Sequence, residues 1–237
     1  MLENIDLQQV LVLDIETAPQ YPSFNELPVD YQQLWDQKTR FQRRDGETAA
    51  EFYSRGGILA EFGKIICISV GIFTKKKELS LRVKSFYGDE EKVVIQAFID
   101  LLNKQSDSLI LCAHNGKEFD FPYLCRRILI NGLKIPSQLN IQGKKPWEIM
   151  HLDTMDLWKF GDYKNYTSLK LLAAVFNIPS PKDDIDGSMV HKVYWEENDL
   201  ERIRIYCEKD VITTAQILLK FKSLPALSTD KITIVNP

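Results

Sequence analysis

Two acidic residues, Asp14 and Glu16, close an apolar run that reads VLVLDIET over residues 10–17. An unbroken row of Val, Leu and Ile predicts a strand buried on both faces. Because residues two apart along a strand point to the same side, the two carboxylates are expected to lie together near its end. Neighbouring carboxylates with little water around them need a shared proton or a bound cation, and carboxylate oxygens suit Mg²⁺ or Mn²⁺. The alternative is that both face solvent at the strand end.

A third carboxylate, Asp120, follows a second short apolar run at residues 109–113. The sequence that connects them contains Gly116, which permits a tight turn, and Pro122 comes next, a residue suited to the first turn of a helix. Asp120 is therefore expected at a strand-to-helix junction, beside the end of the strand 10–17. Its alternative role is that of a helix N-cap, which Asp commonly fills.

A tyrosine and a fourth carboxylate, Tyr206 and Asp210, occur together in the last predicted helix. This helix is expected to begin at Asn198, with Glu201 three residues later in a capping-box-like start, and to end near residue 222. Residues four apart share one face of a helix, so the two side chains are expected to lie together. Alternatively, the ring packs in the core and the carboxylate lies on the surface.

The elements that position these residues alternate between strands and helices. With 237 residues and 44% hydrophobic content, the chain is expected to form a single α/β domain, residues 1–237, with a mixed central sheet. Strands are predicted at 10–17, 64–73, 79–86 and 109–113, and residues 149–157 are expected to form a further strand and its exit. The second and third strands are expected to form an antiparallel hairpin beside the first. Helices are predicted at about 89–104, 120–130, 168–176 and 198–222.

Residues 20–62 form a long insertion between the first two predicted strands, far beyond the usual length of a connection. This insertion mixes Tyr31, Trp35 and Phe41 with basic residues that include Arg43 and Arg44. Such mixtures stack bases and follow phosphates on single-stranded nucleic acid. The alternative is an amphipathic helix whose rings pack inward and whose arginines are solvated.

Composition and charge narrow the function classes. A net charge of −3 argues against broad non-specific nucleic-acid binding, although it leaves room for a local basic groove beside an acidic site. The four cysteines form no C-x-x-C pair and the three histidines show no ligand spacing, so we expect core cysteines in a reducing compartment and no zinc site. Neither a signal peptide nor a membrane-spanning run is recognisable, which favours a cytoplasmic protein without a membrane partner.

Taken together, the acidic motifs resemble those of the DEDD superfamily of 3′–5′ exonucleases. The matching sequences are LDIET at 13–17, N-x-x-x-F-D at 115–120 and Y-x-x-x-D at 206–210. The third motif is similar to that of the tyrosine subclass, since the histidine subclass would need His where Ile205 stands. With EFGKII at 61–66, the chain also resembles the proofreading domain of family B DNA polymerases and, more closely, stand-alone bacterial exonucleases related to it. The resemblance covers residues 10 to about 220.

This resemblance implies a ribonuclease-H-like fold and a two-metal-ion hydrolysis of phosphodiester bonds from a 3′ end. It implies that Asp14 bridges two divalent ions, Mg²⁺ or Mn²⁺. Glu16 and Asp210 would complete the coordination of one ion, and Asp120 would hold the other. Tyr206 would orient the attacking water, because a phenol with its usual pKa of about 10 is uncharged at neutral pH.

The resemblance also indicates which residues meet the substrate. Asn115 and Phe119 would contact the terminal nucleotide, and Thr17 would lie near its 3′-hydroxyl. The expected partner is the 3′ end of single-stranded DNA, whereas protein partners are not indicated. An exoribonuclease of the same subclass and a catalytically silent nucleic-acid-binding module are the alternatives.

Overall fold

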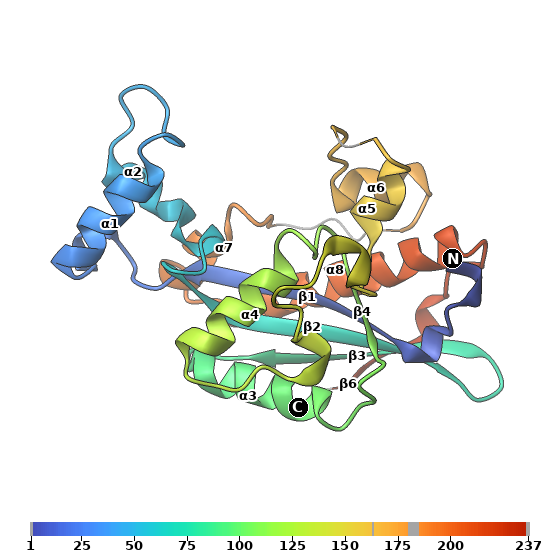
Figure 1. Cartoon of the computed structure of the whole chain (residues 1–237). Coiled ribbons are helices and arrows are strands. Elements are labelled where there is room, and N and C mark those ends of the chain that lie inside the picture. The colour runs from blue at the N-terminus through green and yellow to red at the C-terminus, as the bar shows by residue number, and fades with distance from the viewer. Residues whose placement is uncertain (1, 163, 180–184, 236–237) are drawn as a thin grey trace.

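The computed structural model describes residues 2–162, 164–179 and 185–235, and within them six strands form one mixed sheet. The sheet order is β5-β4-β1-β2-β3-β6 (Figure 1). Strand β2 is antiparallel to both of its neighbours, β1 and β3, whereas the pairs β5–β4, β4–β1 and β3–β6 are parallel. The predicted α/β class with a mixed sheet is confirmed. The strands are β1 Val10–Pro19, β2 Gly63–Lys75, β3 Leu79–Tyr87, β4 Ile110–Ala113, β5 Leu152–Asp153 and β6 Ile232–Val235.

Helices cover both faces of this sheet. One face carries α3 and α4, whereas the long helix α8 crosses the other. Short 3₁₀ helices occur in the connections, among them Tyr53–Ile58 between β1 and β2. The α-helices are α1 Val29–Thr39, α2 Ala49–Phe52, α3 Glu91–Leu102, α4 Asp120–Ile130, α5 Thr154–Lys159, α6 Leu169–Val175, α7 Val190–Trp195 and α8 Leu200–Phe221.

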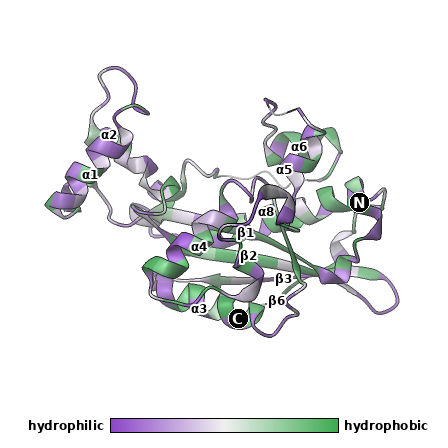
Figure 2. Cartoon of the chain, in the orientation of Figure 1, coloured by the Kyte–Doolittle hydropathy of each residue, from purple (hydrophilic) through white to green (hydrophobic). Residues whose placement is uncertain are grey.

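The alternation of side chains along β1 decides which helix each residue meets. Leu11, Leu13 and Ile15 pack in the core formed with α3 and α4, whereas Val10 and Val12 pack in the core formed with α8. Hydrophobic residues accordingly line the strands and the helix faces turned to them (Figure 2). The prediction of a strand buried on both faces is confirmed, and the residues that continue the even-numbered series are directed to α8.

A β-bulge interrupts the pairing of β1 with β2. Glu16 pairs with Cys67 but Thr17 pairs with Ile65, so the register shifts between Glu16 and Thr17. A bulge turns side chains away from strict alternation and is common beside functional sites. Here the residues on both sides of the shift, Ile15, Glu16 and Thr17, line one cavity.

The chain between β1 and β2 projects beyond the end of the sheet as a lobe that contains α1 and α2 (Figure 1). Trp35 is completely buried in the small core of this lobe, and its Nε1 donates a hydrogen bond to the carbonyl of Ala49 over 2.8 Å. Arg43 is paired with Asp36 over 2.6 Å. For Trp35 the packing alternative is therefore the correct one, while Phe41 stays 85% exposed.

The strand predicted within 149–157, together with its exit, is confirmed as β5, but it is short and its exit is helical. Only Leu152 and Asp153 pair with β4, and α5 begins at Thr154. The reason is that the carboxylate of Asp153 accepts hydrogen bonds from Met155 and Asp156 N–H, which caps a helix at that position.

The C-terminal part of the chain also departs from the sequence-based expectation. Helix α8 begins two residues after Asn198, because Asn198 has a φ of 54° and Asp199 is the N-cap. Neither α7 nor β6 was predicted from the sequence. Strand β6 pairs in parallel with β3, a contact that only the folded sheet creates.

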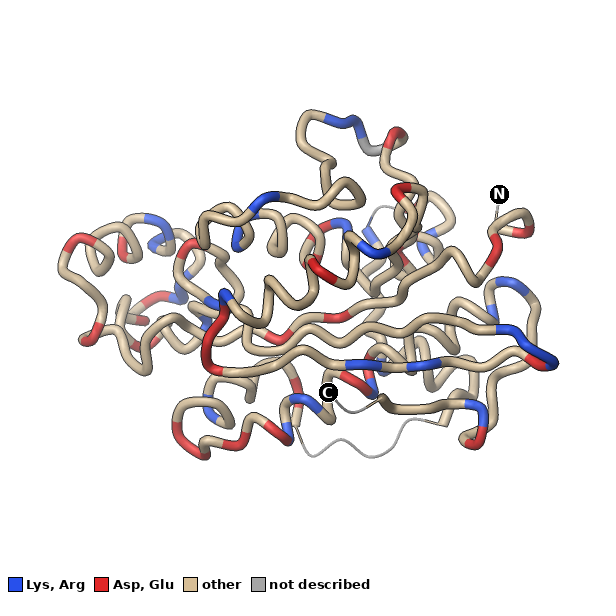
Figure 3. The backbone as a smooth tube through the Cα atoms, turned by 90° about the horizontal axis from the view of Figure 1, so that it is seen from below, with Lys and Arg blue, Asp and Glu red and all other residues tan. Residues whose placement is uncertain are grey.

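Basic residues gather at the turn between β2 and β3. Figure 3 shows the basic cluster at the turn between β2 and β3, where Lys75, Lys76 and Lys77 are exposed, as expected for a solvated turn. Among the described residues, the structure contains no helix with the length and apolar character needed to span a membrane.

Candidate active site

Five of the predicted site residues come together where β1, α4 and α8 meet. Asp14 and Glu16 lie on the side of β1 that faces α8, and Asp120 is the first residue of α4. Tyr206 and Asp210 lie one turn apart on α8. The charges of Asp120 and Asp210 both influence the two carboxylates of β1. The arrangement thus places four carboxylates and one phenol within electrostatic reach of one another.

Burial shifts the acid–base behaviour of these carboxylates. It raises the pKa of Asp14 and that of Glu16 well above their usual values, and the neighbouring carboxylates add to the effect. Burial also raises the pKa of Asp120 to about 7, assisted by Asp153 and Asp210 and opposed by hydrogen bonds from backbone N–H groups. Crowded, desolvated carboxylates retain protons until a cation compensates their charge.

A pH dependence of stability follows from the pKa of Asp120. Between about pH 4 and the folded-state pKa of about 7, folded Asp120 holds a proton that the unfolded chain has released. Rising pH therefore removes stability, and metal-free wild type is expected to lose about 1–4 kcal/mol relative to Asp120→Asn across this window. Urea unfolding in EDTA at about pH 5 and about pH 8 measures the difference.

The comparison with Asp120→Asn separates this effect from that of the histidines. Burial lowers the pKa of His114 and that of His151. These two groups therefore lower the free energy of unfolding as the pH falls, whereas Asp120 lowers it as the pH rises. Both histidines are present in the two proteins, and their contribution cancels in the difference. If the free energy of unfolding changed with pH equally in wild type and Asp120→Asn, the raised pKa of Asp120 would be contradicted.

The position of Asp120 differs from that of a simple N-cap. The N-cap of α4 is Phe119, and Asp120 lies inside the first turn with only 3% of its surface exposed. Its carboxylate also receives a hydrogen bond from the backbone of Ile15 in β1. Asp120 therefore links the start of α4 to the strand that carries Asp14 and Glu16.

Asp153 supports the loop that leads to Asp120, a role that the sequence analysis missed. Its buried carboxylate accepts hydrogen bonds from the N–H groups of Asn115 and Lys117, over 2.9 and 3.0 Å, in addition to those at the start of α5. Asn115 has a φ of 63°, which these bonds help to maintain. The Asp-Thr-Met sequence at 153–155 was the available signal, since Asp before a helix commonly caps it.

Asp153→Ala is expected to lower the free energy of unfolding by about 2–4 kcal/mol, because several backbone N–H groups lose their acceptor together. Urea unfolding measures this change. The matched control is Asp199→Ala, which removes an N-cap that bonds only the N–H of Arg202 among the interactions described and should cost about 1 kcal/mol. Equal losses in the two variants would show that Asp153 is an ordinary cap.

Cys207 is a second site residue that the sequence analysis treated only as core filler. Its thiol donates to Oδ2 of Asp14 over 3.3 Å and lies 3.4 Å from the backbone carbonyl of the same residue. Ligand atoms of Asp14, Glu16 and Cys207 all lie within 4.8 Å of one another. Burial raises the pKa of Cys207, so the neutral thiol acts as a donor that positions the Asp14 carboxylate. Cys207 precedes Asp210 by three residues, and residues three apart lie on the same face of a helix. This spacing was the sequence signal that Cys207 lies near the carboxylates.

Tyr206 combines packing with a polar contact. Its ring lies against the hydrophobic cluster formed around α7, and its hydroxyl hydrogen-bonds to Asp210. Burial, together with the charges of Asp210 and Glu16, raises the pKa of this phenol above its usual value. Tyr206 is consequently neutral at physiological pH and available as a hydrogen-bonding group beside the carboxylates.

The predicted substrate-contact residues fall into two neighbouring hollows. Thr17 and Phe119 line a cavity of about 480 Å³ beside Glu16, together with Arg55 from the lobe and His191 from α7. Asn115 lies instead at a separate hollow of about 340 Å³, which Lys117 and Glu118 of the same loop also line. The sequence analysis missed Arg55 and His191, because both approach the cavity only through the fold.

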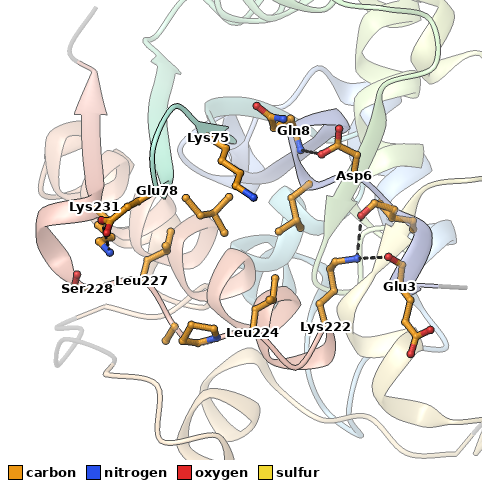
Figure 4. Close-up of a pocket in the computed structure, with 15 residues that line it drawn as sticks. Glu3, Asp6, Gln8, Lys75, Glu78, Lys222, Leu224, Leu227, Ser228 and Lys231 are labelled. Carbon is orange, nitrogen blue, oxygen red and sulfur yellow. Dashed lines mark hydrogen bonds and ion pairs between the residues drawn. The ribbon is translucent and has the colours of Figure 1, made fainter.

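A different hollow of about 580 Å³ lies near the start of β1, at the end away from the carboxylates (Figure 4). There Lys222 donates hydrogen bonds to the backbone carbonyls of Leu2, Glu3 and Ile5. The five central residues of the candidate site are not among those that line it. Lys222 therefore holds the N-terminal segment against the end of α8. The hollow is separate from the candidate active site.

Comparison with a solved structure supports the fold. The structure of the family B DNA polymerase from the hyperthermophilic archaeon Pyrobaculum calidifontis matches with a TM-score of 0.53 and 19% sequence identity. The match covers 90% of this chain and 24% of the polymerase chain. It confirms the predicted ribonuclease-H-like fold.

Comparison with protein families identifies the chain more closely. Residues 58–232, well over half of the chain, match the family described as a predicted 3′–5′ exonuclease related to the exonuclease domain of PolB. The matched region contains Asp120, Tyr206 and Asp210, whereas β1 with Asp14 and Glu16 precedes it. The chain belongs to this family of predicted 3′–5′ exonucleases related to the exonuclease domain of PolB.

Proposed function

We propose that this protein is a metal-dependent exonuclease of the tyrosine subclass that removes nucleotides from the 3′ end of single-stranded DNA. The observation that carries the proposal is the convergence of Asp14, Glu16, Asp120 and Asp210 from three separate elements, with Tyr206 beside them. Carboxylate oxygens that retain protons in the absence of a cation fit hard divalent cations such as Mg²⁺ or Mn²⁺. The sulfur of Cys207 lies beside Asp14 and Glu16, but burial raises the pKa of this thiol and keeps it neutral.

Within this proposal the four carboxylates would hold two divalent ions. When bound, such ions offset the negative charge that develops on the phosphate and on the leaving 3′-oxygen. Asp14 occupies the central place, because it is influenced by Glu16, Asp120 and Asp210 alike. The thiol of Cys207 keeps the Asp14 carboxylate oriented toward this centre.

The remaining residues of the site position the reactants. The neutral hydroxyl of Tyr206 holds the attacking water by a hydrogen bond, while its own bond to Asp210 fixes the ring. Thr17 and Phe119 line a cavity of about 480 Å³ beside Glu16, which has the size of a ligand pocket and receives the terminal nucleoside. Asn115 lines a separate hollow, so its proposed contact with the terminal nucleotide requires the nucleotide to extend past Phe119 toward that hollow.

The test is degradation of labelled oligonucleotides by the purified protein. A single-stranded DNA labelled at its 5′ end should give a ladder that shortens with time in Mg²⁺ or Mn²⁺, and a 3′-labelled strand should release its label first as a mononucleotide. EDTA should abolish both. An RNA strand of the same sequence, assayed alongside, tests the exoribonuclease alternative. Release of the 5′ label first, or no cleavage in either metal, would overturn the proposal.

A further inference from the structure

Three exposed aromatic rings lie on two loops near the 115–119 loop. Trp147 is 75% exposed, Phe160 86% and Tyr166 64%. Lysine ammonium groups accompany two of these rings, with Lys145 Nζ 5.2 Å from the ring centre of Trp147 and Lys159 Nζ 4.6 Å from that of Tyr166. Large exposed rings beside cations are typical of surfaces that stack nucleic-acid bases.

The backbone at Phe160 argues that this exposure has a function. Phe160 ends α5 with a φ of 45°, a left-handed conformation that disfavours a residue with a bulky side chain. A glycine would adopt this conformation readily. The ring of Phe160 meets only the edge of Trp158 among the ring contacts described, with ring centres 6.5 Å apart, and it stays 86% exposed. Strain of this kind is found where a side chain is held out for a ligand.

The loops that carry the rings are joined directly to the loop of the candidate active site. Lys117 is paired with Asp156 of α5 over 2.9 Å, and the hydroxyl of Tyr166 donates to Glu118 over 3.3 Å. Lys144 and Lys159 line the hollow of about 340 Å³ that also contains Asn115. Tyr166 and α5, which Phe160 ends, therefore contact the 115–119 loop directly, and the segment that carries Trp147 meets this loop at the hollow through Lys144.

We infer that Trp147, Phe160 and Tyr166 form a stacking surface for the bases of single-stranded nucleic acid that lie upstream of the cleaved nucleotide. Lys144 and Lys145, both exposed, supply positive charge for its phosphates on a chain whose net charge is −3. Every base has a face to stack on such rings, so this surface accepts DNA and RNA strands without sequence preference. A duplex, whose bases are already paired and stacked, gains nothing from it. The inference rests on the proposed function.

The test compares Trp147→Ala and Phe160→Gly with wild type. Fluorescence anisotropy in EDTA measures the affinity for 5′-labelled twelve-residue strands of dT and of rU and for a blunt DNA duplex. Each variant should bind the single strands about 5- to 100-fold more weakly and the duplex equally well. Phe160→Gly should melt at no lower temperature than wild type, since glycine relieves the backbone strain. Trp147→Phe, which keeps a ring, should retain most of the affinity.

Phe41→Ala is the matched control. Phe41 is 85% exposed and carries Arg40 4.4 Å from its ring centre, so it matches the proposed surface in ring and cation. It differs in position, because it belongs to the lobe with α1 and α2, which lies apart from α5 and α6 (Figure 1). This change should leave the affinity for the twelve-residue strands unchanged. Lys144→Ala combined with Lys145→Ala should instead flatten the salt dependence of binding, which the two aromatic variants preserve.

Short substrates separate this inference from the proposed function. A thymidine dinucleotide reaches the cleavage position but is too short to cover three rings, so the aromatic variants should cleave it in Mn²⁺ at the wild-type rate. If wild type cleaves neither substrate, the proposed function is wrong, and anisotropy in EDTA still tests the surface. Unchanged affinity of Trp147→Ala and Phe160→Gly for single strands, or an equal loss for the duplex, would overturn the stacking surface.

Discussion

Asp14→Asn is expected to lower the single-turnover rate of nucleotide release by at least about 10³-fold. The substitution keeps the size of the side chain and an oxygen that can accept the hydrogen bond from Cys207. It removes the negative charge from the residue on which Glu16, Asp120 and Asp210 all act. Cleavage of a 5′-labelled DNA strand in Mn²⁺ and calorimetric titration with Mn²⁺ measure the two losses.

The same variant should fold at least as well as wild type when metal is absent. Burial raises the pKa of Asp14, which means that its charged form destabilises the metal-free protein. Thermal unfolding in EDTA at about pH 8 should therefore show an equal or higher Tm for Asp14→Asn. The control is Asp30→Asn, an exposed residue in α1, which should change neither cleavage nor metal binding. Near wild-type cleavage by Asp14→Asn would refute the site.

Tyr206→Phe is expected to lower the cleavage rate by a factor within or below the range of about 10²–10⁴ that a lost general acid–base group costs. Its affinity for Mn²⁺ should stay nearly unchanged. The phenylalanine ring keeps the packing against the cluster around α7 and removes only the hydroxyl. Asp210→Asn, one helical turn away, should lose both metal affinity and rate, because it removes a charged ligand. Mn²⁺ calorimetry and single-turnover cleavage distinguish these two profiles.

Two outcomes would contradict the role given to Tyr206. Cleavage at the wild-type rate by Tyr206→Phe would show that the ring only packs. Loss of metal binding as severe as that of Asp210→Asn would show that the hydroxyl supports the ions and does not position water. Tyr87→Phe is a suitable control, since Tyr87 is another half-buried tyrosine packed against the same cluster.

The central features of the fold followed from local patterns in the sequence. The apolar run before Asp14 predicts a strand because β-branched and aliphatic residues without polar interruptions suit a buried strand. The apolar stripe at 89–104 predicts α3, which spans Glu91–Leu102. Spacings of two and four residues likewise predict that Asp14 lies beside Glu16 and Tyr206 beside Asp210, since each pair shares one element.

Residues that act through distant contacts carried weaker signals. Asp153 has two of its hydrogen-bonding partners at Asn115 and Lys117, almost forty residues earlier in the chain. Cys207 contacts Asp14 across nearly the whole chain. In both cases the short-range sequence suggests an ordinary cap or an ordinary core cysteine, and only the partner reveals the further role.

By itself, the sequence determined the type of most elements and which acidic residues share a strand or a helix, because backbone periodicity acts over a few residues. Only the tertiary structure decided that β1, α4 and α8 bring these acidic residues to one place. It also decided that the exit of the strand predicted within 149–157 is the helix α5, and that Trp35 is buried within its own lobe. Those outcomes depend on contacts between segments far apart in the chain. The burial that raises the pKa of Asp14, Glu16 and Asp120 is likewise a property of the assembled core.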